Sequence, residues 1–227
     1  HRDLDVHYFS DYALFTGAVR QYVAKTLFEA FKADPNDWHR RLVIVGLYKE
    51  EFAAYEDLGA ILESIIRWRR KEIKVPFEGM LRYKDDKVAL PALFARRNIR
   101  SSLDLATALE VENLVPPDWP NVVPDIDCAA GLRAITKFIV EDCLNNQKSH
   151  GVEAYNRIKH GLILFPNGQR YLSTSPNAPA VLLNTKSPKS ANPYTMMAMP
   201  MTDDLIERRS LLIEFIQASL RAIAALY

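Results

Sequence analysis

Two long segments at the start of the chain carry apolar residues at the spacing of an α-helix. The first covers residues 4–31 and ends at Asp34-Pro35, because the residue before a proline disfavours helix. The second begins near Asn36 or Asp37, both good helix caps, and extends to about Glu72. Each apolar stripe needs a partner on one side, which predicts two long helices packed antiparallel. The expected stripes comprise Tyr8, Tyr12, Phe15, Val19, Tyr22, Val23 and Phe31 in the first helix, and Leu42, Val45, Phe52, Tyr55, Leu58, Leu62, Ile65 and Ile66 in the second.

The stretch from residue 73 to residue 127 has a different pattern. Its six prolines forbid a long helix. Short helices fit at Leu90–Arg97 and at Ser101–Val111, where Ser101 or Ser102 would act as the cap. The stretch has too few apolar residues for a core of its own, so we interpret it as a Pro-rich excursion from the bundle. A third helix is expected from about Cys128 to Gln147.

The segment after the third helix predicts one short helix and then a small β-hairpin region. Gly151–His160 has helical spacing, and Gly161 is a good residue to end the helix. Leu162–Phe165 and Tyr171–Ser173 flank the turn residues 166–168, which is typical of a hairpin. Further short strands are expected at Val181–Leu183 and Tyr194–Met199.

A last helix is expected from Thr202 to Tyr227, with Thr202 as its cap and a long apolar stripe. This stripe either closes the bundle or pairs with its copy in a two-fold dimer, and we favour the homodimer. The prediction is therefore a mainly α fold, an up-and-down helical bundle with a Pro-rich excursion and a small β-hairpin region after residue 161. The whole of residues 1–227 is expected to form one domain: bundle 4–160, β-containing loop segment 162–201 and C-terminal helix 202–227. The stripe comprises Leu205, Leu211, Leu212, Phe215, Leu220, Ile223 and Leu226.

Composition and charge exclude several classes of protein. The chain is 48% hydrophobic and 25% charged, which argues against disorder. A net charge of +1 lacks the basic excess of a dedicated nucleic-acid or membrane-surface binder, so such a contact would need a local patch. Cys128 and Cys143 have no neighbouring Cys or His at metal-finger spacing. No run has the length of a membrane span and no signal-peptide core is present, so we expect a cytoplasmic protein without metal, cofactor or membrane contact.

One short polar motif carries candidate chemistry. On a helical wheel of residues 151–161, Glu153, Asn156, Arg157 and His160 share one arc, and Lys159 lies nearby in the sequence. Tyr155 falls on the opposite, apolar arc. Histidine titrates near neutral pH and arginine grips phosphate oxygens, so this face has the groups needed for proton transfer and phosphate binding. The same pattern also fits an ordinary solvated helix face, and on these residues alone that interpretation is favoured.

The string Tyr-Asn-Arg-Ile-Lys-His over residues 155–160 resembles the motif of the HEPN superfamily, helical-bundle proteins of prokaryotic toxin, defence and RNA-processing systems. The family pattern is Arg, a polar residue, a few variable residues and His. Asn156 matches the polar position and His160 the histidine, while Tyr155 stands where the family has arginine. Arg157 shares a helix face with His160 and is the candidate replacement. The resemblance covers the bundle over residues 4–160 and does not extend to the segment after Gly161.

The resemblance implies two function classes. The first, favoured because the family arginine is replaced, is a non-catalytic homodimeric module that binds RNA or a partner protein in a toxin or defence context. The second is a metal-independent endoribonuclease, in which His160 would move a proton, Arg157 would stabilise the phosphate and Asn156 would assist, with Glu153 and Lys159 as binding residues. Whether the chain is an enzyme is left open between them.

Two basic clusters lie outside the motif. Arg67, Arg69, Arg70, Lys71 and Lys74 surround Trp68 at the end of the second helix. A second cluster, at the end of the short helix at 90–97 and just after it, contains Arg96, Arg97 and Arg100. A basic helix end with an aromatic residue can bind a nucleic-acid backbone. Cations are also favoured at a helix C-terminus by the helix dipole, which is the interpretation that the sequence alone favours.

Overall fold

The computed structural model describes residues 2–81, 90–113, 128–146, 157, 164–165, 179–184, 194–199 and 202–225. The chain divides into two compact units, which are treated separately below. The first unit contains His1–Ala18, Tyr55–Ser149 and Ile216–Tyr227, and the second contains Val19–Ala54 and His150–Phe215. Three long helices contribute to both units: α1 (Arg2–Ala33), α2 (Asp37–Arg69) and α10 (Asp203–Ala225). The single domain predicted over residues 1–227 stays a prediction.

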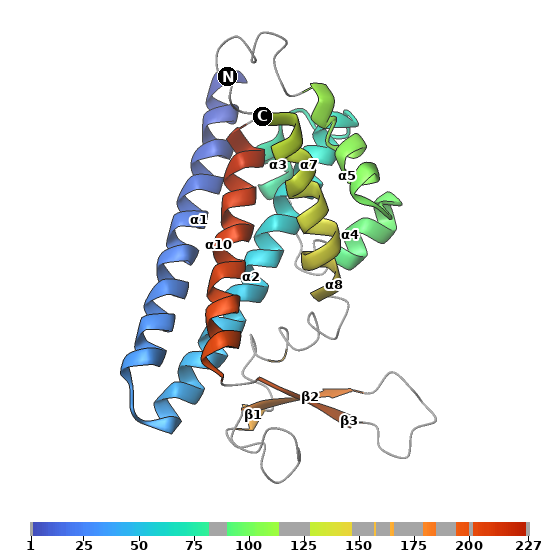
Figure 1. Ribbon diagram of the computed structural model, residues 1–227. Coiled ribbons are helices and arrows are strands. Elements are labelled where there is room, and N and C mark those ends of the chain that lie inside the picture. Colours follow the sequence, from blue (N-terminus) through green and yellow to red (C-terminus); the bar gives the residue numbers. More distant parts are fainter. Residues whose placement is uncertain are drawn as a thin grey trace. The chain divides into compact units, whose positions relative to one another are not determined.

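In the second unit, α1 and α2 form an antiparallel hairpin (Figure 1). Arg20 of α1 pairs with Glu50 of α2 at 3.1 Å, and the Arg40 guanidinium lies 4.1 Å from the centre of the Phe31 ring. Of the two residues in α1, Phe31 comes later in the chain, and its partner Arg40 comes earlier in α2 than Glu50. This order is the one that antiparallel packing requires. The loop between them is three residues long, and the Asn36 side chain caps α2 by accepting from the backbone N–H of Trp38. The predicted helical hairpin is confirmed.

The last helix, α10, packs alongside α2 in the second unit and runs parallel to it. Arg40 pairs with Asp203 at 3.2 Å, and Arg209, farther along α10, pairs with Glu51, farther along α2. The helix begins as expected, because the backbone N–H groups of Leu205 and Ile206 donate to the Thr202 carbonyl. Its buried face includes Ile206 and Ile213. Part of the predicted stripe is therefore buried within the chain and part of it, Leu205, Leu211 and Phe215, is exposed.

The second unit also contains a three-stranded antiparallel sheet. Strand β1 (Leu164–Phe165) pairs with β2 (Ala180–Asn184), and β2 pairs with β3 (Tyr194–Ala198). The predicted β-hairpin between Leu162–Phe165 and Tyr171–Ser173 is not supported, because the partner of Leu164 is Val181. The turn residues at 166–168 indicated a local reversal, but the pairing is made with a strand farther along the chain. Residues 171–173 lie outside the described residues.

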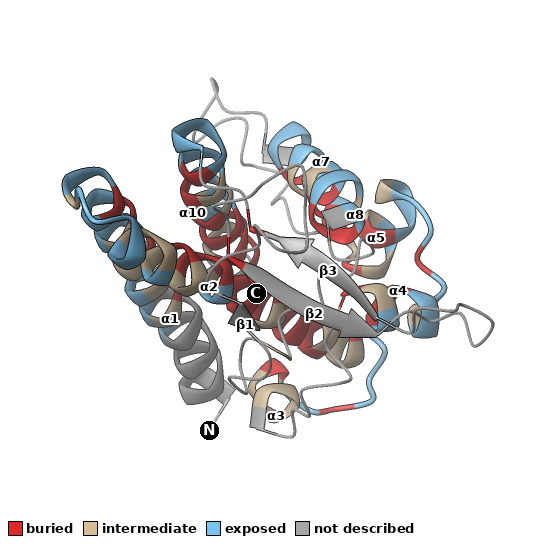
Figure 2. Cartoon of the chain, turned by 90° about the horizontal axis from the view of Figure 1, so that it is seen from below, coloured by how far each residue is buried: buried red, intermediate tan, exposed pale blue. Residues whose placement is uncertain are grey.

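In the first unit, short helices surround the second half of α2, which is buried on nearly all sides between Tyr55 and Ile66 (Figure 2). The predicted short helices are confirmed as α4 (Leu90–Arg97) and α5 (Ser102–Ala108). Ser101 caps α5 by accepting from the Asp104 N–H, and the Asp104 carboxylate accepts from the Ser101 N–H in return. A further short helix, α3 (Pro76–Leu81), begins at a proline, which is tolerated at the first helical position.

The predicted third helix is confirmed, with a change of winding inside it. It consists of α7 (Cys128–Phe138), a π-helical turn η3 (Ile139–Cys143) and α8 (Leu144–Asn146). The 3-10 turn η2 (Val111–Asn113) follows α5 and is tied to α7 by an ion pair between Glu112 and Arg133 at 3.5 Å. α1 and α10 also meet in this unit: a Cβ built on Gly17 would lie 2.8 Å from the Gln217 Oε1 atom. The mainly α-helical fold with packed helices is confirmed.

The stripe predicted to bury α1 is wrong in its first part. Phe15, Val19 and Tyr22 are 75%, 46% and 72% exposed. The buried side of α1 is formed by Ala24, Phe28 and Phe31. Apolar residues occupy both sides of this helix, so their spacing alone did not distinguish the side that packs from the side that faces outward.

Candidate functional site

Of the motif residues, the structure describes Arg157 alone. Arg157 is helical, half-buried and part of the second unit. Glu153, Asn156, Lys159 and His160 lie outside the described residues, as does Tyr155. Their grouping on one helix face, and the burial of Tyr155, therefore stay predictions.

The two basic clusters, in contrast, are well described and lie together in the first unit. Arg97, at the end of α4, connects them. Its guanidinium donates to both carboxylate oxygens of Glu63 at 3.1 and 2.9 Å, and to Glu72 at 2.7 and 3.0 Å. Glu63 lies in α2 and Glu72 in the turn that follows α2. One arginine fork therefore holds the C-terminal end of α4 against the C-terminal end of α2.

The Arg97 fork also shifts the pKa values of Glu72 and of Arg97 itself. Hydrogen bonding by Arg97 lowers the pKa of the Glu72 carboxyl, with further contributions from the charges of Arg97, Arg67 and Arg70. The hydrogen bond to Glu72 is the largest cause that raises the pKa of Arg97, and Glu63 adds to it. Both groups are therefore held in their charged forms near neutral pH, so the connection between the two helix ends is permanent under these conditions.

Several arginines of the clusters are neutralised by acidic residues. Arg96 pairs with Glu63 at 3.2 Å, Arg67 with Glu72 at 3.6 Å, and Arg69 with Glu110 at 3.2 Å. Four cations remain exposed and, within the part of the chain that the structure describes, form no ion pair. We call these four residues the basic surface: Arg70, Lys71, Lys74 and Arg100.

The backbone at the end of α2 directs this surface outward. Lys71 has a φ of 59°, the left-handed conformation that commonly ends a helix. The Lys71 N–H donates to the Trp68 carbonyl at 2.9 Å, and the Glu72 N–H donates to the Arg67 carbonyl at 2.9 Å. These bonds satisfy carbonyls of the last helical turn and turn the chain sharply there. Arg100 is placed by a similar ending of α4, where Asn98 has a φ of 57° and accepts from the Arg100 Nε at 3.1 Å.

The second unit contains a buried polar cluster of Tyr48, Glu51 and Arg209. Glu51 is 3% exposed and accepts a hydrogen bond from Arg209, whose guanidinium lies 3.6 Å from the centre of the Tyr48 ring. Burial raises the pKa of Tyr48 to about 12; the charge of Glu51 also raises it, and the charge and hydrogen bond of Arg209 oppose the increase. A neutral phenol and an ion pair whose charges balance have little capacity to bind a further charged group. We therefore interpret this cluster as a structural connection between α2 and α10.

No group of three or more His, Cys, Asp or Glu side chains with metal-binding geometry occurs among the described residues. Within the same residues, no helix combines the length and the apolar composition needed to cross a membrane. Comparison of the chain with protein-family models, with curated proteins and with solved structures gave no match.

The sequence contained the signal for the basic surface, but not its geometry. Both clusters were visible as runs of Arg and Lys, and the helix dipole appeared sufficient to explain them. The residue that joins them is Glu63, near the C-terminal end of α2, whose partner Arg97 lies 34 positions later in the sequence. No local pattern marks that pairing.

Proposed function

We propose that this chain is a HEPN-like helical protein of a prokaryotic toxin or defence context, and that it binds RNA without cleaving it. The observation that carries the proposal is the basic surface of the first unit. Four exposed cations from two helix ends are held together by Arg97, a grouping suited to the phosphates of a nucleic-acid backbone. The resemblance of residues 155–160 to the HEPN motif implies that the nucleic acid is RNA. The absence of catalysis follows from Tyr155, which stands where that family has arginine.

The position of the surface within the first unit also fits a binding role. Arg69 stacks its guanidinium 4.8 Å from the centre of the Trp68 ring, so an aromatic residue lies beside the cations. Single-stranded nucleic acids bind where cationic grooves are combined with aromatic stacking. The four cations lie on two segments that the Arg97 fork joins.

The test is the salt dependence of RNA binding. A fluorescent single-stranded RNA is titrated with wild type and with Lys71→Glu/Lys74→Glu at several salt concentrations. Each lost phosphate contact lowers the slope of log affinity against log salt by about 0.7 for single strands, so the variant should lose about 1.4. The matched control is Lys49→Glu/Arg208→Glu, which reverses two exposed cations of the second unit. If both variants weaken binding equally, the surface is not the contact; if wild type binds no RNA, the proposal fails.

The alternative function is the endoribonuclease that uses His160 with Arg157 and Asn156. Its support is the predicted helix face that these residues share in the sequence. A cleavage assay without added metal distinguishes it from the binding function. Cleavage by wild type that is lost in His160→Ala would support the enzyme.

A further inference from the structure

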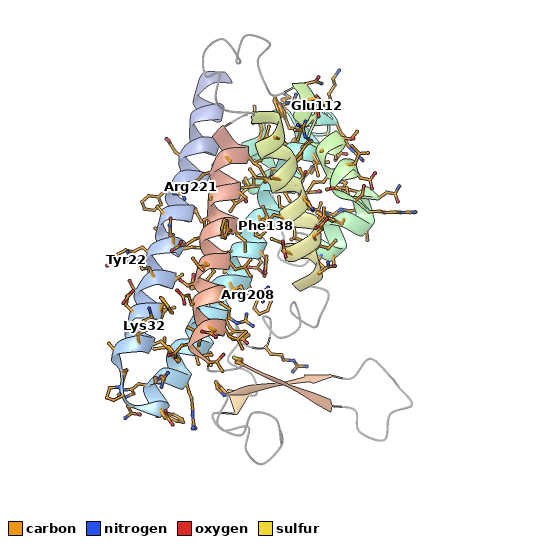
Figure 3. All side chains as sticks on the ribbon, in the orientation of Figure 1. Tyr22, Lys32, Glu112, Phe138, Arg208 and Arg221 are labelled. Atoms are coloured by element: carbon orange, nitrogen blue, oxygen red, sulfur yellow. The ribbon has the colours of Figure 1, made fainter. Side chains whose placement is uncertain are left out.

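The outer face of α1 carries an exposed apolar stripe. Phe15, Val19, Tyr22 and Thr26 are all exposed, and they are spaced four, three and four residues apart. At 100° per residue they fall within an arc of about 60°. Figure 3 shows the Tyr22 side chain projecting away from α2 and α10. The Thr26 hydroxyl donates to the Tyr22 carbonyl at 2.9 Å, so its polar group is already satisfied on the same helix.

This stripe is not the packing face of α1. The residues that pack, Ala24, Phe28 and Phe31, fall on the opposite side of the helical wheel. A stripe with four-three spacing is the pattern that pairs two helices in a coiled coil. Large side chains exposed in a row, in contrast to single exposed ones, mark an interaction surface. The remaining question is which helix pairs with it.

The charges beside the stripe indicate a second copy of α1. Asp11, Lys25, Glu29 and Lys32 are exposed along one edge of the stripe. The opposite edge is uncharged and carries Thr16, Val23 and Ala30. In a parallel pair, opposite edges meet, and the charges would find no partner. In an antiparallel two-fold pair, like edges meet, and Asp11 of each copy reaches a lysine of the other.

We propose that α1 pairs with α1 of a second copy of this chain, antiparallel and about a two-fold axis. In the register that suits the charges, Asp11 lies beside Lys25 of the second copy. Phe15 then packs beside Val19 of the second copy, and Tyr22 lies opposite position 12. The inference does not depend on RNA binding, and it assigns the dimer contact to α1, whereas the sequence had suggested the C-terminal helix.

The first test is the oligomeric state of the full chain by sedimentation equilibrium. Wild type is expected to be a dimer at micromolar concentration. Phe15→Glu/Tyr22→Glu should raise the dissociation constant by at least about 30-fold, because aromatic residues at interface centres dominate affinity. Leu103→Glu is the matched control: Leu103 is 74% exposed on α5, and its substitution should leave the dimer intact. A monomeric wild type, or equal effects of both variants, would overturn the proposal.

The second test concerns the antiparallel orientation of the two α1 helices, and it uses substitutions at exposed positions. Asp11→Lys should weaken the dimer, and Asp11→Lys/Lys25→Asp should restore it to within about threefold of wild type, since the pair is rebuilt with its charges exchanged. For cross-linking, Asp11→Cys and Lys25→Cys chains are mixed under oxidising conditions, with wild type as the control for native cysteines. A disulfide between the two different chains is expected. Absence of this disulfide, in a mixture that still dimerises, would contradict the proposal.

Discussion

Arg209 of α10 donates a hydrogen bond to Glu51 of α2, a carboxylate that is almost completely buried and lies 158 residues away in the chain. The pair connects the last helix to the central helix of the second unit. The Arg209 side chain is partly exposed to solvent, whereas the Glu51 carboxylate is not. Water can therefore solvate the charge of Arg209 but not that of Glu51. Arg209 places a positive charge directly against the buried Glu51 carboxylate.

Loss of Arg209 should therefore destabilise the protein strongly. Arg209→Met removes the guanidinium that donates to a buried carboxylate, and breaking a buried ion pair typically costs about 3–5 kcal/mol. The neighbouring Arg208 is exposed, and Arg208→Met should change the free energy of unfolding by less than about 0.5 kcal/mol (Figure 3). Urea denaturation of both variants measures the difference. The double variant Glu51→Leu/Arg209→Met should recover most of the stability, and failure to do so would show that packing of Arg209 on Tyr48 is the larger contribution.

Tyr48 should make the protein sensitive to alkaline pH. Its pKa is raised to about 12 by burial, whereas in the unfolded chain it is about 10. As the pH rises, the Tyr48 phenol therefore loses its proton in the unfolded state before it does so in the folded state. Its contribution to the free energy of unfolding is complete below pH 10 and is lost as the pH rises through 12. The difference of about two pKa units between the folded and unfolded states corresponds to roughly 2–3 kcal/mol in the free energy of unfolding. About half of this free energy is lost by pH 11. Unfolding free energies of wild type and Tyr48→Phe should converge between pH 9 and pH 11; an unchanged difference would contradict the account.

Two glycines of the first unit should respond to alanine in opposite directions. A Cβ on Gly79 of α3 would lie 2.5 Å from the Ser64 Oγ and 3.0 Å from the Ser64 Cα, a backbone atom that cannot easily move. A Cβ on Gly131 of α7 meets no atom within 4 Å. Gly79→Ala should cost about 1–3 kcal/mol through overpacking, and Gly131→Ala should add up to about 1 kcal/mol through helix propensity. Thermal unfolding of the two variants is the measurement, and stabilisation by Gly79→Ala would show that α3 does not pack closely on α2.

The elements that were predicted correctly depend on interactions between near neighbours. The capping box of Ser101 and Asp104 spans three residues, and the start of α10 at Thr202 depends on the cap itself. The pairing of Leu164 with Val181 and the burial of Glu51 depend on residues much farther along the chain. Helical periodicity showed that α1 is amphipathic, but it did not show that Phe15 and Tyr22 face outward, because that depends on which side α2 covers.

For the site, the residue types were visible in the sequence and their arrangement was not. The basic runs at the ends of α2 and α4 were evident, yet only the structure shows that Glu63 and Glu72 neutralise some arginines and leave Lys71 and Lys74 exposed. The motif around His160 stays a prediction from the sequence.

The most direct test of the proposed function measures binding and cleavage on the same sample. A fluorescent single-stranded RNA is mixed with wild type at a concentration that saturates the anisotropy signal, with EDTA present to remove metal ions. After prolonged incubation the RNA is released and analysed on a denaturing gel, and His160→Ala is treated in parallel. The proposal predicts saturable binding by both proteins and intact RNA in both samples. Absence of binding, or cleavage by wild type that His160→Ala abolishes, would contradict it.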